Sequence, residues 1–278
     1  MTPSPITEHT PQVDLAALKA RQHGVWSSGD YALIGSTLQI VGETLLEAVD
    51  PRAGWRVLDV AAGNGNATLA AARRGCEVTS TDYVPELLEH GKARAAANRL
   101  DVAFRQADVE ALPFADASFD AVLSTFGVMF TPNQEKTASE LARVCKPGGS
   151  IGLANWTPEG FIGQLFKTIG NYIPPAPGVK SPSLWGTKAG LDALFGKTAL
   201  EIHTTQREFV FRYRSPMHWI DVFRTYYGPM NKTFGALDAE RQAAFTRDVL
   251  ALMESRNRSG GRSLVLPSEY LEVVIDRK

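Results

Sequence analysis

The chain has 278 residues, of which 44% are hydrophobic, so it can form one large or two small domains around a substantial core. Its 29 basic and 30 acidic residues leave a net charge of −1, which provides no global field for a polyanion and does not indicate nucleic-acid binding. The only two cysteines, Cys76 and Cys145, argue against a disulfide framework or a thiolate metal cluster. We expect both as buried free thiols in a reducing cytoplasm.

The N-terminal part of the chain predicts helices after an irregular leader. Residues 1–12 contain three prolines and lack an apolar core of signal-peptide length, so we expect a disordered leader there. A short helix is expected from Val13, and a second one, following residues 24–31, through Leu46. No run of about 20 apolar residues predicts a membrane span anywhere.

A buried strand, a glycine turn and a helix follow one another over residues 57–72. Hydrophobic residues without clean alternation at 57–60 are typical of a strand covered on both faces, and 67–72 has high helix propensity. Between them, Gly63 and Gly65 allow positive φ and have no Cβ. A ligand can therefore approach the main chain closely where helix amides point outward. The segment indicates a nucleotide-type cofactor loop.

The loop is an imperfect match to a dinucleotide site, because the third glycine of Gly-x-Gly-x-x-Gly is replaced by Thr68. Together with Asp59, it resembles the Asp/Glu-x-Gly-x-Gly-x-Gly signature of class I S-adenosylmethionine (SAM) methyltransferases. The departure is Ala61, where that family usually has glycine. An alanine can be tolerated there if its φ stays negative.

Further stretches follow in the order that this resemblance implies. A second strand ends at Asp82, 17 residues past Gly65, where the family's acidic residue accepts hydrogen bonds from the ribose hydroxyls. Residues 102–114 resemble the third strand and adenine loop, which implies that Asp108 takes the adenine amino group and that the Val109 amide faces the ring. Residues 118–126 resemble the "S-F-D-x-V" fourth strand, and residues 141–149 the turn "L-x-E-x-x-R-V-L-K-P-G-G" into the fifth.

The resemblance covers roughly residues 20–156 and is closest to the methyltransferases of ubiquinone and menaquinone biosynthesis. It implies an α/β Rossmann-like, doubly wound, seven-stranded sheet whose last strand is antiparallel. It also implies SAM as cofactor and S-adenosylhomocysteine (SAH) as product. The SAM-binding core would span 51–156, preceded by a helical lid over 13–50. The residues expected to contact the cofactor are Gln22, Trp26, Tyr31, Asp59, Ala61, Gly63, Gly65, Asp82, Tyr83, Asp108, Val109 and Ser124. Alternatively, Trp26 and Tyr31 pack the N-terminal helices onto the sheet.

The C-terminal part, 157–278, alternates helices and strands. We expect helices over 160–170, 185–195, 216–227 and 239–254, strands over 199–213 and 270–275, and irregular structure at the proline run 174–178. In the resembling family the final strand inserts antiparallel at the sheet edge. Residues 217–259 would then be an insertion over the crevice, which we interpret as a cap that covers the methyl acceptor.

Methyl transfer from a sulfonium is an in-line displacement that requires alignment and exclusion of water, while a dedicated base is optional. His23 stands beside the expected lid and His218 opens the cap helix, so both are candidate bases or acceptor contacts. Tyr226 and Tyr227 end that helix and could orient an acceptor with their hydroxyls. Core packing at helical spacing is the alternative for the aromatic residues of the helix.

The leading hypothesis is a SAM-dependent methyltransferase that acts on an O, N or S atom of a small, partly apolar metabolite. A non-catalytic SAM-binding or assembly protein would keep the same loop, and a nicotinamide-dependent oxidoreductase would share the loop and Asp82. The oxidoreductase should also show a Tyr/Lys or Cys/His arrangement after the fourth strand, which residues 124–130 lack. The scattered histidines and cysteines predict no metal site. The sequence does not identify the acceptor or the oligomeric state.

Overall fold

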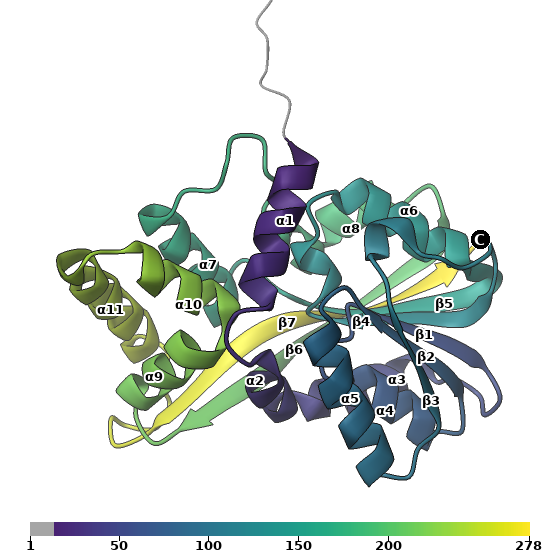
Figure 1. Ribbon diagram of the computed structural model, residues 1–278, viewed down its shortest axis with the longest axis horizontal. Coiled ribbons are helices and arrows are strands. Elements are labelled where there is room, and N and C mark those ends of the chain that lie inside the picture. The colour runs from purple at the N-terminus through teal and green to yellow at the C-terminus, as the bar shows by residue number, and fades with distance from the viewer. Residues whose placement is uncertain (1–13) are drawn as a thin grey trace, which may run out of the picture.

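A seven-stranded mixed sheet forms the centre of the molecule in the computed structural model, which describes residues 14–278 (Figure 1). The strand order is β3-β2-β1-β4-β5-β7-β6, and β7 runs antiparallel to both of its neighbours. The strands are β1 (Arg56–Val60), β2 (Glu77–Asp82), β3 (Val102–Gln106), β4 (Phe119–Thr125), β5 (Cys145–Trp156), β6 (Ala199–Tyr213) and β7 (Leu264–Arg277). The predicted α/β Rossmann-like sheet with an antiparallel last strand is therefore confirmed.

Helices cover both faces of the sheet. Those preceding β6 are α1 (Leu15–Trp26), α2 (Tyr31–Thr37), α3 (Gln39–Val49), α4 (Asn66–Arg73), α5 (Pro85–Ala97), α6 (Gln134–Val144), α7 (Phe161–Tyr172) and α8 (Lys188–Phe195). Figure 1 shows α3, α4 and α5 on one side of the sheet and α6 and α8 on the other. Val57 and Leu58 are both fully buried and belong to two different core clusters, as expected of a strand with two covered faces.

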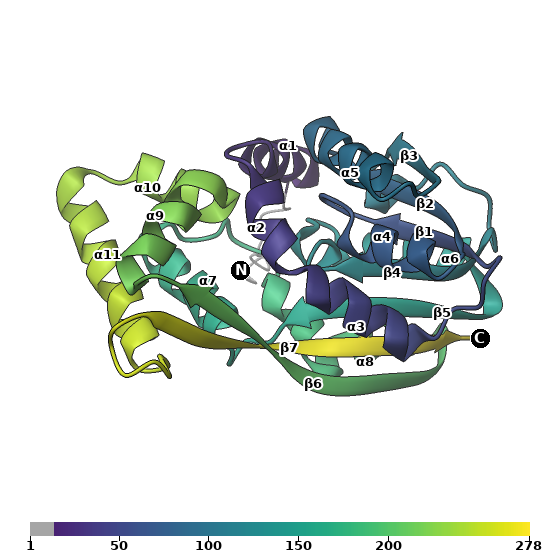
Figure 2. The same cartoon turned by 90° about the horizontal axis from the view of Figure 1, so that it is seen from below.

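The segment between β6 and β7 consists of α9 (Pro216–Tyr226), α10 (Gly228–Ala236) and α11 (Ala239–Glu254). These helices lie at the far end of the long β6–β7 ribbon, away from β3, in both ribbon views (Figures 1 and 2). Helix α10 packs against α1 and α9 against α2, so the insertion and the N-terminal helices adjoin each other. The predicted insertion ahead of the closing strand is present.

Some predicted boundaries differ from those of the structure. The expected second helix is divided at Leu38 into α2 and α3, and α3 packs onto β5 and α4 with Leu45 and Leu46 fully buried. Helix α10 was not predicted, because its run Gly228–Ala236 contains two glycines and a proline near its start. Strand β7 begins at Leu264, ahead of the expected residue 270. Pro267 is accommodated because β7 is paired with β6 there but not with β5.

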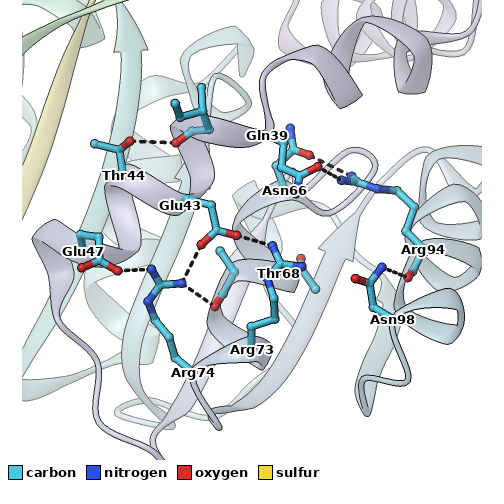
Figure 3. Close-up of polar contacts among 12 residues, drawn as sticks. Gln39, Glu43, Thr44, Glu47, Asn66, Thr68, Arg73, Arg74, Arg94 and Asn98 are labelled. Atoms are coloured by element: carbon cyan, nitrogen blue, oxygen red, sulfur yellow. Dashed lines mark hydrogen bonds and ion pairs between the residues drawn. The ribbon is translucent and has the colours of Figure 1, made fainter.

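Polar contacts fasten α3 to the C-terminal end of α4, and α5 to its start (Figure 3). Glu43 on α3 forms ion pairs with Arg73, the last residue of α4, and with Arg74, its C-cap residue. Arg94 on α5 donates hydrogen bonds to the backbone carbonyl of Asn64 at 2.7 Å and to the side chain of Asn66 at 2.9 Å. The turn between β1 and α4 is therefore held from outside by the side chain of Arg94.

Among the described residues, no single helix is long and apolar enough to span a membrane, although the bent pair α2 and α3 passes by length and composition. Cys76 and Cys145 are buried and free, as predicted. The expected disordered leader, residues 1–12, lies outside the described residues.

Candidate cofactor and acceptor site

A cavity of about 890 Å³, its open mouth included, lies between the N-terminal helices and the carboxyl ends of β1, β2 and β4. We call it the main cavity. Its lining includes most of the residues expected to contact a cofactor, namely Gln22, Trp26, Tyr31, Ala61, Gly63, Asp82, Tyr83, Asp108 and Val109. The topology places it where open α/β sheets bind ligands.

The loop between β1 and α4 has the backbone that its glycines allow, with φ of +55° at Gly63 and +81° at Gly65. Ala61 also has a positive φ, +47°, so the expectation of a negative φ at this position is wrong. The left-handed conformation costs a non-glycine residue about 1–2 kcal/mol. A Cβ on Gly127, in the loop after β4, would lie only 2.5 Å from the Ala61 carbonyl oxygen, so the two loops touch at the base of the cavity.

Asp59 lies beneath the cavity and does not line it. One of its carboxylate oxygens accepts hydrogen bonds from the Thr68 backbone N–H at 2.8 Å and from the Thr68 hydroxyl at 2.6 Å. The other oxygen is buried without a hydrogen bond from the described residues. Burial raises the pKa of Asp59 to about 7. Asp59 thus fastens the first turn of α4 to β1. Gly65 also lies outside the cavity lining, and it is the N-cap residue of α4.

Asp82 ends β2 and faces the main cavity, with only 4% of its surface exposed. It accepts hydrogen bonds from the backbone N–H groups of Gly63 and Val84, both at 2.9 Å. Burial raises the pKa of the carboxyl to about 6, although these hydrogen bonds favour the ionised form. A buried carboxylate that lines a cavity and has a raised pKa is typical of a ligand-binding site.

The residues expected to contact adenine meet the N-terminal helix α1 at one ion-pair cluster. Lys19 of α1 lies 2.5 Å from an oxygen of Asp108 and 2.5 Å from an oxygen of Glu110. The second Asp108 oxygen accepts a hydrogen bond from the Glu110 backbone N–H at 2.9 Å. Val109 is buried between them and contributes to the cavity wall. Asp108 therefore lines the cavity, as expected, but it is also a partner of the lid.

The aromatic lid residues line the cavity and also pack on one another. The Trp26 ring lies 5.6 Å from that of Tyr31 and 4.8 Å from that of Phe130, centroid to centroid. A Cβ on Gly63 would come within 3.5 Å of the Tyr31 ring, so this ring rests on the glycine loop. Trp26 and Tyr31 therefore both line the cavity and pack on neighbouring rings, and their contact with a cofactor stays a prediction.

Besides Asp59 and Gly65, four further residues that were expected in the site do not line the main cavity. They are Ser124, His23, His218 and Tyr226. Ser124 is fully buried and donates to the Val60 carbonyl at 2.9 Å, which shapes the loop after β4. His23 packs edge-on against Tyr83 with ring centroids 5.2 Å apart. His218 packs against Tyr213, and Tyr226 is half-buried. Neither residue lines the main cavity or the smaller cavity beside it.

A second, smaller cavity adjoins the first, with about 300 Å³ of empty space when its open side is included; we call it the aromatic chamber. Its walls are Trp26, Tyr31, Ile34, Leu38, Phe126, Phe130, Trp156, Ile162, Phe211, Phe223 and Tyr227. Five of these residues also line the main cavity: Trp26, Tyr31, Leu38, Phe126 and Phe130. Phe126, with φ of +57°, stacks on Trp156 at 3.9 Å between ring centroids, so the loop after β4 separates the two spaces.

Several residues of both spaces were not predicted from the sequence. Asn64 stands at an unspecified position of the glycine motif and Asn66 follows that motif, while Phe130 lies outside the stretches that carry the family resemblance. The sequence did indicate one of these residues. Trp219, Phe223 and Tyr227 are spaced four residues apart, which places Tyr227, and not Tyr226, on the same helix face as Phe223. At the opposite end of β6, one side-chain O or N atom each of Glu201, His203 and the half-buried Asp276 lie within 4.8 Å of one another, a grouping that the sequence did not suggest.

The sheet order, the glycine loop and the acidic residue at the end of β2 define a class I SAM-dependent methyltransferase. A family model described as a methyltransferase domain matches residues 58–153. The chain is 42% identical over 253 residues, 90% of each chain, to the uncharacterized protein Rv1403c of Mycobacterium tuberculosis. It is 40% identical over 125 residues to the demethylmenaquinone methyltransferase of Renibacterium salmoninarum, covering 45% of this chain and 50% of that enzyme.

Among solved structures, the YcgJ protein of Bacillus subtilis has the same fold, with a TM-score of 0.58 and 23% identity over 84% of this chain and 97% of that one. The chain belongs to the class I SAM-dependent methyltransferases, resembles the quinone methyltransferases among them, and is an enzyme that uses SAM.

Proposed function

We propose that this enzyme transfers the methyl group of SAM to an O, N or S atom of a small, partly apolar metabolite bound in the aromatic chamber. The observation that carries the proposal is the wall of five residues shared by the chamber and the main cavity. A molecule in the chamber would face a cofactor in the main cavity across that wall. The lining, which is almost entirely hydrocarbon, favours an apolar acceptor.

The residues of the main cavity fit SAM. Asp82 presents a buried carboxylate that can accept hydrogen bonds from ribose hydroxyls, and Gly63 leaves its backbone open to close approach. Asp108 and the backbone of Val109 lie where the adenine is expected. When bound, SAM supplies an electrophilic methyl group on a positively charged sulfur. The protein's task is then to align the acceptor with it and to exclude water.

Trp26, Tyr31 and Phe130 are the groups that can align donor and acceptor, because they border both spaces. Trp26 comes from the lid helix α1, and Tyr227 lies 5.8 Å from it between ring centroids at the end of α9. The lid and the insertion thus meet over the chamber.

The proposal is tested by screening small metabolites for SAM-dependent methylation and comparing two phenylalanine variants. Phe211→Leu enlarges the chamber at a side chain that does not line the main cavity. We expect it to change acceptor preference and KM while SAM affinity stays the same. Phe234→Leu removes a similar buried volume from α10 outside the chamber, and serves as the matched control for lost stability. Equal effects of both variants on acceptor turnover would place the acceptor elsewhere.

A further inference from the structure

The aromatic chamber contains a tyrosine hydroxyl that the protein itself does not satisfy. Tyr227 is 4% exposed, and within residues 14–278 neither its hydroxyl nor that of Tyr31 has a hydrogen-bond partner. The rings of the two tyrosines lie 6.3 Å apart between centroids. The Tyr227 oxygen itself is not fully buried, so the hydroxyl can donate a hydrogen bond to a group bound in the chamber that the residue lines.

The polar side-chain groups around the chamber are all neutral donors. They are the hydroxyls of Tyr31 and Tyr227 and the indole N–H groups of Trp26 and Trp156, and every other lining side chain is hydrocarbon. The lining contains no carboxylate, imidazole or amine among the residues that the structure describes. A bound acceptor therefore finds donors for a lone pair or a negative charge, but no side chain that readily takes its proton.

We infer that the acceptor enters the chamber as the anion of an acidic phenol or thiol on a compact apolar body, with its charged atom held by the Tyr227 hydroxyl. This inference rests on the proposed function and narrows its substrate class. Tyr31, which borders both spaces, is placed to contribute a second hydrogen bond on the side of the main cavity. Tyr227 acts as a positioning and charge-stabilising residue and not as a base.

The surroundings of the two tyrosines agree with this role, because they raise the pKa of both hydroxyls. Burial raises the pKa of Tyr227 well above 10, and the nearby Tyr31 raises it further. Burial likewise raises the pKa of Tyr31, with an added contribution from the charge of Asp82. Both hydroxyls therefore stay protonated at neutral pH and remain hydrogen-bond donors.

The charges and atoms of the transfer balance without a base. The acceptor has lost its proton to water before it enters, and its lone pair forms the new bond to the methyl carbon. The bond between that carbon and the sulfonium sulfur breaks, and its electron pair stays on sulfur. A negative and a positive charge disappear together, which an apolar chamber favours. An alcohol would retain its proton, and an amine would give a cationic product with a proton still to lose.

The first test uses 4-nitrophenol as a spectroscopic probe, because its phenolate is yellow and its neutral form is not. The protein is loaded with sinefungin, an amine analogue of SAM that has no transferable methyl group. The probe is then titrated at a pH below its own pKa. We expect it to bind as the phenolate, with its apparent pKa lowered. In Tyr227→Phe we expect phenolate affinity to fall about ten- to a hundredfold, the effect of losing one hydrogen bond to a charged group.

Tyr226→Phe is the matched control, because Tyr226 is adjacent in sequence and lines neither space. It should leave phenolate affinity unchanged, and sinefungin affinity should be the same in all three proteins. Binding of the neutral phenol, no binding to folded, sinefungin-loaded protein, or equal affinity in Tyr227→Phe and wild type would each overturn the inference.

The second test compares turnover of four single-ring acceptors: thiophenol, 4-nitrophenol, benzyl alcohol and benzylamine. Methylation restricted to thiophenol and 4-nitrophenol, with kcat/KM falling below the pKa of each acceptor, supports the inference. Preferential methylation of benzyl alcohol or benzylamine would overturn it while leaving the proposed function intact. The proposed function fails separately if the chamber variant Phe211→Leu has no effect on any acceptor found by screening.

Discussion

The carboxylate of Asp82 accepts a hydrogen bond from the backbone N–H of Gly63 at 2.9 Å, which ties the end of β2 to the glycine loop that follows β1. The same side chain holds the Val84 N–H with its other oxygen. Asp82 therefore orders the loop and also lines the cavity expected to hold the ribose. These two contributions can be separated by substitution.

Asp82→Ala should weaken SAM binding about ten- to a hundredfold, because the ribose loses hydrogen bonds to a charged group. It should also lower stability, since two backbone N–H groups lose their acceptor. Asp82→Asn keeps one carbonyl oxygen as an acceptor and should preserve more of the stability than of the affinity. Isothermal titration with SAM and thermal unfolding of the two variants measure both effects. Unchanged SAM affinity in a folded Asp82→Ala protein would contradict the assignment.

Stability of the SAM-free protein should rise as pH falls from about 7 to 5. Burial raises the pKa of Asp59 to about 7 and that of Asp82 to about 6, above the ordinary aspartate value of 3.8. In this window the folded protein binds more protons than the unfolded chain, so unfolding free energy decreases with increasing pH. The measurement is Tm against pH. Asp59→Asn should flatten the profile between pH 6 and 7, and an identical profile would show that Asp59 is ionised as usual.

Ala61→Gly should be neutral or stabilising by up to about 1.6 kcal/mol. Relief of the left-handed conformation at φ +47° contributes about 1–2 kcal/mol, and the greater freedom of glycine in the unfolded chain removes about 0.4–1 kcal/mol of it. Ala62→Gly is the control, because Ala62 is not among the residues with positive φ and should lose stability on the same substitution. Urea unfolding measures both. If the two variants are destabilised alike, the Ala61 backbone is not strained.

The cofactor half of the site was largely predictable from the sequence, whereas the acceptor half was not. Asp82 and Gly63 belong to consecutive units of a parallel sheet, and the carboxyl ends of such strands converge at one edge. The aromatic chamber is assembled from Trp156 on β5, Phe211 on β6 and Tyr227 beyond α9, whose proximity depends on tertiary packing. The positive φ of Ala61 was equally hidden, because the local preference of an alanine favours a negative value.

Lys19→Met should speed the release of SAM and SAH about two- to fivefold, with little effect on stability. Helix α1 has no buried residue of its own, and Lys19 links it to Asp108 and Glu110 at the mouth of the main cavity. Partly exposed ion pairs contribute about 0.2–1 kcal/mol and weaken with salt, so added salt should speed release from the wild type but much less from the variant. Lys92→Met, which removes an exposed pair with Glu89 on α5, is the control and should leave release unchanged. Stopped-flow displacement of SAH provides the rates. Slower release from Lys19→Met would mean that Lys19 competes with the adenine for Asp108 instead of holding the lid closed.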